Sequence, residues 1–216
     1  LFMAGEIKLM LEGSDLDPAS AADPLTKSAR FKQVSILKRK TADATTLRFG
    51  EGASADSLVN ILAISSGVAT QGAHRSTAIQ IDAGATLNSI TNSGQILAVS
   101  SGGTADVTAI RDLSGTLTSL TNTGSIQANL SPNDKGDAMT GTVTAIDARA
   151  NTTGLTLIQS GTTGTVNVDN PDTDGDGVPD AQEPEILGDI RLGSGADVLD
   201  IRNGVVEGAI SFGAGA

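Results

Sequence analysis

Short runs of aliphatic and β-branched residues alternate with polar turns along most of the chain. SLVNILAISS, QILAVS, TVTAI, LTLI and TVNV are such runs, separated by clusters of Gly, Asn and Ser. Runs of this length and composition are typical of β-strands, and the turn clusters interrupt them too often for helices. The pattern therefore predicts an all-β chain made of many short strands.

The strand pattern repeats along the chain at a spacing of about 30 residues. Residues 77–98 read TAIQIDAGATLNSITNSGQILA, and residues 108–128 read TAIRDLSGTLTSLTNTGSIQA. Asn92 of the first copy recurs in the second copy as Asn122. A chain that repeats itself at a fixed period is typical of stacked repeat architectures.

A second phrase repeats at a shorter spacing near the end of the chain. Residues 190–196 return at 210–216 with matching Ile, Gly and Ala positions, and residues 47–52 look like another copy. A unit of 20 to 30 residues with two or three strands fits one coil of a parallel β-solenoid, whose apolar side is buried only when coils stack. The fold we predict is a parallel β-solenoid (β-helix) with short irregular insertions.

The Thr-Asn-Ser/Thr-Gly phrase at 91–94 and 121–124 is the expected corner of such a solenoid. Gly at a corner permits a positive φ, and stacked Asn side chains can form an amide ladder. We therefore expect Asn92 and Asn122 to lie one above the other.

Turn residues and Pro divide the chain into four expected parts. Pro is concentrated near residues 18–24 and 132–184 and is absent between them, as in an uninterrupted ladder. We expect an N-terminal β-rich capping segment at 1–46, solenoid repeats at 47–168, an acidic calcium-loop insertion between rungs at 169–185, and further rungs at 186–216.

Composition narrows the classes of protein and site. Aromatic residues make up 2% of the chain, with no Trp or Tyr, so the core must be built from small aliphatic side chains. The net charge of −11 disfavours nucleic acid as a partner, because nucleic-acid binding depends on Lys and Arg. No apolar stretch is long enough for a membrane-spanning segment. The absence of Cys excludes disulfides and thiolate metal sites.

An acidic sequence, DTDGDGVPDAQE, matches the D-x-D-x-D-G-x5-E calcium loop in full. A hard cation takes oxygen ligands at alternate loop positions, and Gly177 would make the sharp turn. The expected Ca²⁺ ligands are Asp172, Asp174, Asp176, the carbonyl of Val178, Asp180 and Glu183. The flanks look β-like or irregular, so a helix–loop–helix hand is not expected. The alternative is a disordered acidic linker; a calcium site of this class would have a Kd of about 10⁻⁴–10⁻³ M.

Two other motifs favour structural roles. His74 is the only His and no G-x-S-x-G sequence occurs, so a serine triad is not expected and His74 is interpreted as a loop residue. Residues 193–199, GSGADVL, resemble one copy of a calcium-roll nonapeptide but do not recur at nine residues, so we interpret them as a solenoid turn.

The sequence does not refute a pair of carboxylates that hydrolyses glycosidic bonds. The candidate residues are Asp82, Asp106, Asp112 and Asp147. Sugar-processing clefts generally use aromatic platforms, which the chain does not offer, and the repeat positions of Asp82 and Asp112 indicate a solvated turn. A geometric criterion separates the alternatives. Two acids that converge with Arg111 or Arg149 on one exposed groove would favour an enzyme.

The phrases TAI…SGTLTSLTNTGSIQA and GSGADVLDIRNGVVEGAISFGAGA resemble the passenger regions of bacterial autotransporters, chiefly the large alphaproteobacterial type. The resemblance covers about residues 47–216. It implies a right-handed parallel β-helix displayed at the bacterial cell surface, outside the outer membrane. The serine protease domain of proteolytic members is absent here.

These observations together predict a non-catalytic structural or adhesive element of the cell surface, stabilised by calcium: a stalk, filament subunit or surface-layer component. Its expected partners are other copies of itself, neighbouring surface proteins and surface glycans. One alternative is a polysaccharide-acting β-helix enzyme, either a lyase or a hydrolase. Another is a host-binding or phage-binding module that uses the loops at 131–138 and 169–185.

Overall fold

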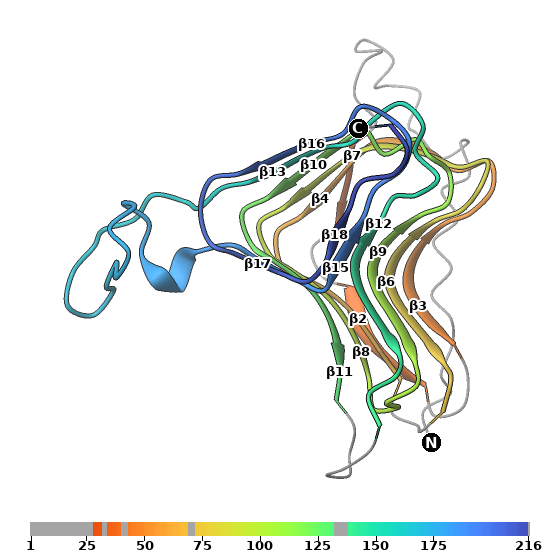
Figure 1. Ribbon diagram of the computed structural model, residues 1–216, viewed down its shortest axis with the longest axis horizontal. Helices are drawn as coiled ribbons and strands as arrows, with labels where there is room; N and C mark the ends of the chain where they lie inside the picture. The colour runs from red at the N-terminus through yellow and green to blue at the C-terminus, as the bar shows by residue number, and fades with distance from the viewer. Residues whose placement is uncertain (1–27, 32–33, 40–42, 69–71, 132–137, 216) are drawn as a thin grey trace, which may run out of the picture.

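The protein forms a three-sided stack of parallel strands (Figure 1). The computed structural model describes residues 28–31, 34–39, 43–68, 72–131 and 138–215. Within them, eighteen strands form three six-stranded parallel sheets, which we call A, B and C. The predicted all-β parallel solenoid is confirmed.

The sheets take every third strand of the chain. Sheet A contains β1 (Ser28–Phe31), β4 (Ser54–Asn60), β7 (Thr86–Asn92), β10 (Ser119–Asn122), β13 (Thr156–Gln159) and β16 (Val198–Ile201). Sheet B contains β2 (Val34–Arg39), β5 (Ala63–Val68), β8 (Gln95–Ser100), β11 (Ser125–Leu130), β14 (Glu185–Leu187) and β17 (Val205–Glu207). Sheet C contains β3 (Ala44–Phe49), β6 (Arg75–Ile81), β9 (Asp106–Asp112), β12 (Thr142–Asp147), β15 (Asp189–Arg191) and β18 (Ile210–Ser211).

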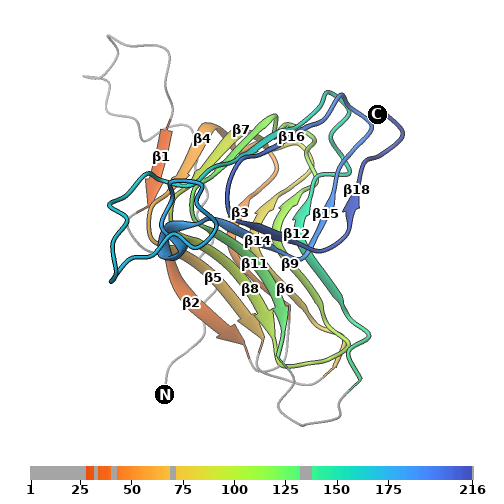
Figure 2. The same cartoon turned by 60° about the vertical axis from the view of Figure 1, so that its left-hand side comes forward.

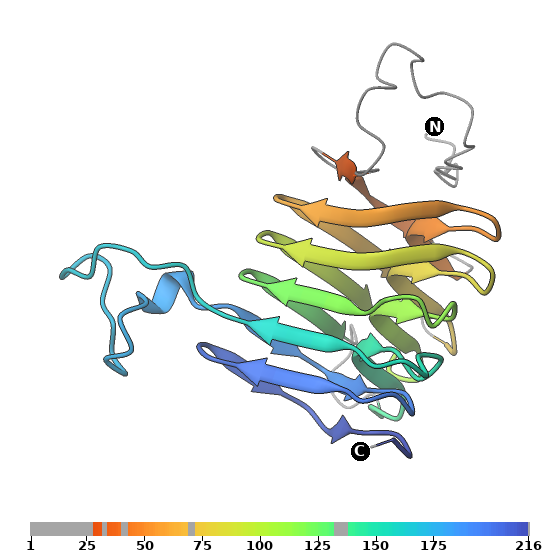
Figure 3. The same cartoon turned by 90° about the horizontal axis from the view of Figure 1, so that it is seen from above.

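Each coil contributes one strand to each sheet, and Figure 3 shows the coils as successive layers. The coil length is not constant. Asn122 follows its neighbour Asn92 by 30 residues, whereas Asp189 receives a hydrogen bond from Ala209, only 20 residues on. Both repeats seen in the sequence are therefore coils of one solenoid. The shorter coil has shorter strands.

The described solenoid begins earlier than the expected boundary at residue 47. β1 pairs with β4, β2 with β5 and β3 with β6, so these strands form the first coil of the same three sheets. Residues 1–27 of the expected capping segment lie outside the described residues. A 3-10 turn, η2 (Asp180–Gln182), is the one helical element in the described chain, and no helix there is long and apolar enough to cross a membrane.

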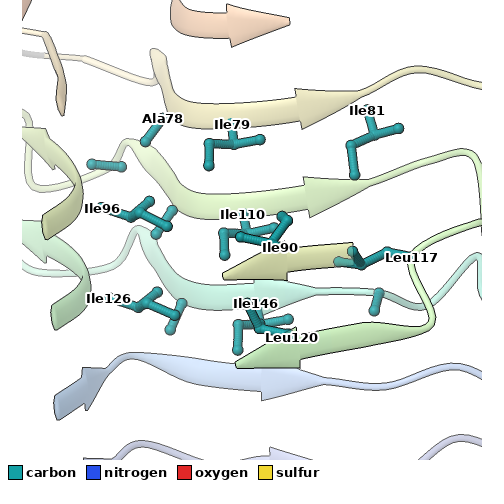
Figure 4. Close-up of a cluster of buried hydrophobic side chains, with 14 of the residues drawn as sticks. Ala78, Ile79, Ile81, Ile90, Ile96, Ile110, Leu117, Leu120, Ile126 and Ile146 are labelled. Atoms are coloured by element: carbon teal, nitrogen blue, oxygen red, sulfur yellow. The ribbon is translucent and has the colours of Figure 1, made fainter. Parts of the chain in front are cut away.

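The core is a set of aliphatic columns, one from each sheet, that run along the solenoid axis (Figure 4). Register pairing stacks equivalent residues of successive coils. The residues of these columns are at most 2% exposed, whereas Ile210, which continues the sheet C column in the last described coil, is 44% exposed. A fully buried Leu or Ile side chain contributes about 1.5–3 kcal/mol. The columns comprise Leu47, Ile79, Ile110, Ile146 and Ile190 in sheet C, Leu58, Ile90, Leu120 and Leu157 in sheet A, and Ile64, Ile96, Ile126 and Ile186 in sheet B.

A side-chain amide ladder runs along the corner between sheets A and B, as the sequence predicts. The Asn60 amide donates to Asn92 Oδ1 at 2.7 Å, Asn92 donates to Asn122 Oδ1 at 2.8 Å, and Asn122 donates to Gln159 Oε1 at 3.0 Å. Asn92 also donates to the Ser125 carbonyl of the next coil at 3.1 Å. Since buried polar groups require partners, the ladder fixes the register of four coils.

The glycines of this corner serve a purpose that the sequence interpretation missed. Gly94 and Gly124 are not among the glycines with positive φ, so neither uses the conformation that Gly permits at a corner. A Cβ on Gly94 would lie 2.1 Å from the Leu62 carbonyl oxygen, and one on Gly124 would lie 2.2 Å from the Gly94 carbonyl oxygen. Glycine is required because successive coils approach each other closely there.

Candidate functional site

The acidic insertion leaves the solenoid at the same corner as the amide ladder (Figures 1 and 2). Strand β13 of sheet A ends at Gln159, and the chain rejoins sheet B at Glu185 in β14. The insertion therefore lies within the fifth coil, between two of its strands, rather than between rungs as expected. Residues 160–184 extend outward without breaking the stacking of β14 on β11.

Three of the predicted calcium ligands converge on this insertion. The carboxylate oxygens of Asp172, Asp174 and Asp176 lie within 4.8 Å of one another. Gly175 and Gly177 have φ of +78° and +90°, backbone conformations that fold the loop around Asp172. Their N–H groups donate to the two Asp172 carboxylate oxygens at 2.7 and 2.9 Å. This arrangement presents several oxygen atoms toward one volume, which suits a hard cation.

The remaining predicted ligands are placed differently. The Asp180 carboxylate accepts hydrogen bonds from the Thr173 backbone N–H at 2.8 Å and the Thr173 hydroxyl at 3.1 Å. The Val178 side chain is 4% exposed and packs over Gly161, where an added Cβ would lie 2.5 Å from Val178 Cγ1. Glu183 and Asp180 are not part of the three-carboxylate cluster.

The electrostatics of the loop reflect its concentration of negative charge. Loss of solvent and the charges of Asp174 and Asp176 raise the pKa of the Glu183 carboxyl above its ordinary value. At Asp172, loss of solvent favours the neutral form, but the N–H groups of Gly177 and Gly175 outweigh it and hold the pKa below its ordinary value. A cation in the loop would relieve the repulsion felt by Glu183.

Asn203 connects the insertion to the solenoid, and the sequence motif does not reveal it. Its side-chain Oδ1 accepts the Gly161 N–H at 2.9 Å, and its amide donates to the Asp176 carboxylate. Asn203 lies between β16 and β17 in the last coil, 27 residues beyond Asp176. Its Asn-Gly position is a sequence signal for a turn, but nothing in the spacing indicates a bond to the acidic loop.

A second candidate site lies on the outer face of sheet C. A hollow of 190 Å³ is lined by residues of β6, β9, β12 and β15, among them Arg75, Asp106, Arg111, Asp147 and Arg191, and by Arg149, two residues beyond the end of β12. Two acids thus converge with both Arg111 and Arg149 on one groove. The geometric criterion that would favour an enzyme is met, although the other two candidate acids, Asp82 and Asp112, do not line the groove.

The carboxylates of the groove are already engaged. Asp147 accepts two hydrogen bonds from the Arg149 guanidinium, both at 2.8 Å, and Asp106 accepts the Thr142 hydroxyl at 2.7 Å. Partial burial disfavours the ionised form of Asp147, but Arg149 and the nearby charge of Arg111 outweigh it and hold its pKa below the ordinary value. The same pairing raises the pKa of Arg149. A general acid needs a raised pKa, and a general base needs a carboxylate that is not already paired. Asp147 has neither property, so this pair is poorly suited to proton transfer.

The other candidate acids serve the fold. Asp82 forms an ion pair with Arg48 at 2.7 Å. Asp112 is buried rather than solvated, which corrects the expected solvated turn, because its carboxylate caps the corner by accepting the N–H groups of Ser114 and Leu117. Asp197 accepts the Leu155 N–H of the preceding coil at 2.7 Å.

The two structural interpretations of motifs agree with the structure. Residues 193–197 form the turn between β15 and β16, as predicted for the GSGADVL sequence. His74 precedes β6 in a loop, and its backbone carbonyl accepts the Asp106 N–H.

Comparisons of the chain with protein-family models, curated proteins and solved structures find no match. The resemblance to autotransporter passengers therefore rests on the repeat phrases, and it stays a prediction.

Proposed function

We propose that this chain is a non-catalytic structural or adhesive element of a bacterial cell surface, in which calcium stabilises the insertion of the fifth coil. The observation that carries the proposal is the unbroken stacking of six coils, with three parallel sheets and an amide ladder along one corner. In such a stack each coil contacts only its neighbours, and length and rigidity follow from repetition. A rigid extended body suits display at a distance from the surface.

Calcium is the cation that the loop chemistry favours. Asp172, Asp174 and Asp176 offer oxygen ligands only, and Ca²⁺ takes six to eight of them in flexible geometry. The Asn203 bridge and the packing of Val178 over Gly161 connect this loop to the solenoid, so binding at the loop stabilises the stack as well. The cation has a structural role in this proposal.

Association with further coils is supported by the last described coil. Its strands have no partner on one side among the described residues, and several of its large apolar side chains are exposed. Another coil, from the same chain or from a second copy, would bury them by continuing the sheets. These side chains are Val198, Ile201, Val205, Ile210 and Phe212.

A polysaccharide-acting enzyme is the second candidate function, and the groove on sheet C favours it. The groove combines two carboxylates with four arginines, the residue types that β-helix lyases or hydrolases would need. The tight pairing of Asp147 with Arg149 weighs against it, because both groups are held in their charged forms. The groove also has no aromatic side chain on which a sugar ring stacks.

A turnover assay separates the two functions. The protein with calcium is incubated with acidic and neutral polysaccharides, and new reducing ends and unsaturated uronate products are measured. We expect neither product to rise above the level given by heat-inactivated protein. Products that disappear in Asp147→Asn but persist in Asp200→Asn would establish the enzyme instead. Asp200 is the matched control, because it forms the same type of ion pair with Arg202 outside the groove.

A further inference from the structure

The outer face of sheet C is concave because each of its long strands bends in the middle (Figure 1). In β6, Ala78 and Ile79 are consecutive and both fully buried, which interrupts the in–out alternation of a flat strand. Ala109 and Ile110 repeat this pattern in β9, and Ala145 and Ile146 repeat it in β12 (residues 144–147 are buried throughout). The bend recurs in three coils, so the resulting hollow runs along the solenoid axis.

Positive charge predominates in this groove of an otherwise acidic protein. Four arginines line it, Arg75, Arg111, Arg149 and Arg191, against the two carboxylates of Asp106 and Asp147. The chain as a whole carries a net charge of −11. An excess of guanidinium groups in one hollow is therefore a local feature and does not follow from composition.

Two of the arginines have unused hydrogen-bonding capacity. Arg149 and Arg191 form ion pairs with Asp147 and Asp189, but no ion pair joins Arg75 or Arg111 to a carboxylate within the described chain. The Nε of Arg111 is buried and has no hydrogen-bond partner among the described residues. A buried donor without a partner is costly. Because Nε is shielded from solvent while Arg111 as a whole is partly exposed, an incoming anion would contact the rest of the guanidinium group.

A row of threonines lies between the arginines on the floor of the groove. Thr77, Thr108 and Thr144 are register partners in successive coils, and all three line the hollow. Hydroxyl groups both donate and accept hydrogen bonds, so they match a ligand that is rich in hydroxyls. The guanidinium groups beside them match carboxylate or sulfate groups through paired hydrogen bonds.

We infer that this groove binds an acidic saccharide, with Arg75 and Arg111 contacting its anionic group and the threonine row contacting its hydroxyls. The inference rests on the adhesive role proposed above, and it assigns that role a ligand class and a surface. At 190 Å³, the hollow is smaller than the roughly 300–1,000 Å³ of typical small-molecule pockets, so it encloses about one sugar unit of a chain that runs along the coils.

The position of the groove separates it from the acidic loop. The insertion projects from the corner between sheets A and B, on the side of the solenoid away from the outer face of sheet C (Figure 1). A polyanion in the groove therefore avoids the acidic residues of the loop. Binding in the groove does not need calcium, which makes the two sites separable by experiment.

The test measures the affinity of calcium-free protein for a polyuronate, for neutral dextran and for polyglutamate, by calorimetry at low and high salt. We expect binding to the polyuronate alone, weakened by salt. Arg75→Gln and Arg111→Gln should each weaken it about tenfold or more, the effect of losing a charge-assisted hydrogen-bonded pair. Arg202→Gln, which removes the same charge outside the groove, should leave the affinity unchanged. Because Arg111 is partly buried, circular dichroism and thermal unfolding of its variant are compared with those of the exposed Arg75 variant.

Each other outcome overturns the inference. Equal binding of polyglutamate would identify a general anion patch, such as a contact for the acidic loop of a second copy. Polyuronate binding that both arginine variants retain would place the ligand elsewhere. No polyuronate binding, with calcium stabilisation intact, would remove the saccharide but leave the structural role. Cleavage of the polyuronate would overturn the non-catalytic function itself.

Discussion

Asn203 donates its side-chain amide to the carboxylate of Asp176 and thereby ties the last coil to the acidic insertion. The two residues are 27 positions apart and belong to different coils. The Oδ1 atom of the same side chain accepts the Gly161 N–H where the insertion begins. A cation held by Asp176 is therefore linked through one side chain to the stacking of the coils.

Replacing Asn203 should weaken calcium binding. Groups that orient metal ligands without touching the metal typically change affinity about 10–100-fold, and we expect Asn203→Ala to lower calcium affinity by about tenfold. Calcium titration by calorimetry measures the affinity of the variant and of the unaltered protein. Asn88→Ala is the control, because Asn88 is an exposed residue of β7, three coils before Asn203. An unchanged affinity in Asn203→Ala would show that the bridge does not organise the loop.

The amide ladder should contribute measurably to global stability. Asn92→Ala removes the donor to Asn122 and the acceptor of Asn60, which leaves buried polar groups unpaired. We expect it to lower the free energy of unfolding by about 1–3 kcal/mol, the cost of an unsatisfied buried group. Urea denaturation gives the value. The adjacent Thr91→Ala, at an exposed position of the same strand, should change it by less than about 0.5 kcal/mol.

The close approach of coils at the corner between sheets A and B predicts a contrast between two glycines. A Cβ on Gly94 would meet backbone atoms of Leu62 at 2.1 to 2.7 Å, whereas one on Gly50 would meet nothing within 4 Å. Gly94→Ala should therefore cost about 1–3 kcal/mol or more, as overpacking does. Gly50→Ala should be nearly neutral. Equal thermal unfolding midpoints for the two variants would contradict the observed spacing of the coils.

A fall in pH should have two opposite effects on the acidic loop. It should stabilise the calcium-free loop, and it should weaken calcium binding. Glu183 has a pKa raised above 4.5 in the folded state, so its contribution to stability is present below 4.5 and is lost as pH rises through the folded pKa. In EGTA, amide exchange at residues 172–183, corrected for intrinsic rates, should thus slow as pH falls through that window. Calcium affinity should fall over the same window, because protonation of Glu183 removes a negative charge beside the three-carboxylate cluster.

Substitution of Glu183 separates this effect from other titrations. Glu183→Gln should abolish the change in exchange above pH 4.5. Asp172 titrates with a pKa below 3.8, so it loses its contribution only at lower pH and does not interfere. Exchange that still slows in the Glu183→Gln variant would assign the effect to another group.

Much of the fold can be predicted from the sequence, because solenoid coils repeat in the chain as they repeat in space. The spacing of Asn92 and Asn122 indicates both the coil and the ladder. Ile190 and Ile210 likewise indicate the shorter coil. A periodic sequence determines which residues stack, since every coil places equivalent residues in the same column.

The sites are predictable only where their residues are neighbours in the chain. Asp172, Asp174 and Asp176 form a local turn, so spacing alone brings their carboxylates together. The pairing of Asn203 with Asp176 depends on the path of the whole insertion and leaves no periodic signal.

For the groove on sheet C, the sequence supplies only a geometric criterion. Its residues come from four strands in different coils and from the turn after β12, and the strand bend that creates the hollow appears in the sequence merely as successive Ala and Ile. The side-chain pairing of Asp147 with Arg149, which makes this pair poorly suited to proton transfer, is likewise set by local geometry.

The central claim, a solenoid stabilised by calcium, is tested most directly by thermal unfolding with calcium and with EGTA. At free calcium of about 100 times Kd, binding to the folded state alone adds about 2.7 kcal/mol. For a chain of this size that corresponds to a rise in Tm of about 5–10 °C. The double variant Asp174→Ala/Asp176→Ala should show no such rise. Equal Tm values for the unaltered protein in calcium and in EGTA, with a folded circular dichroism spectrum in both, would contradict the claim.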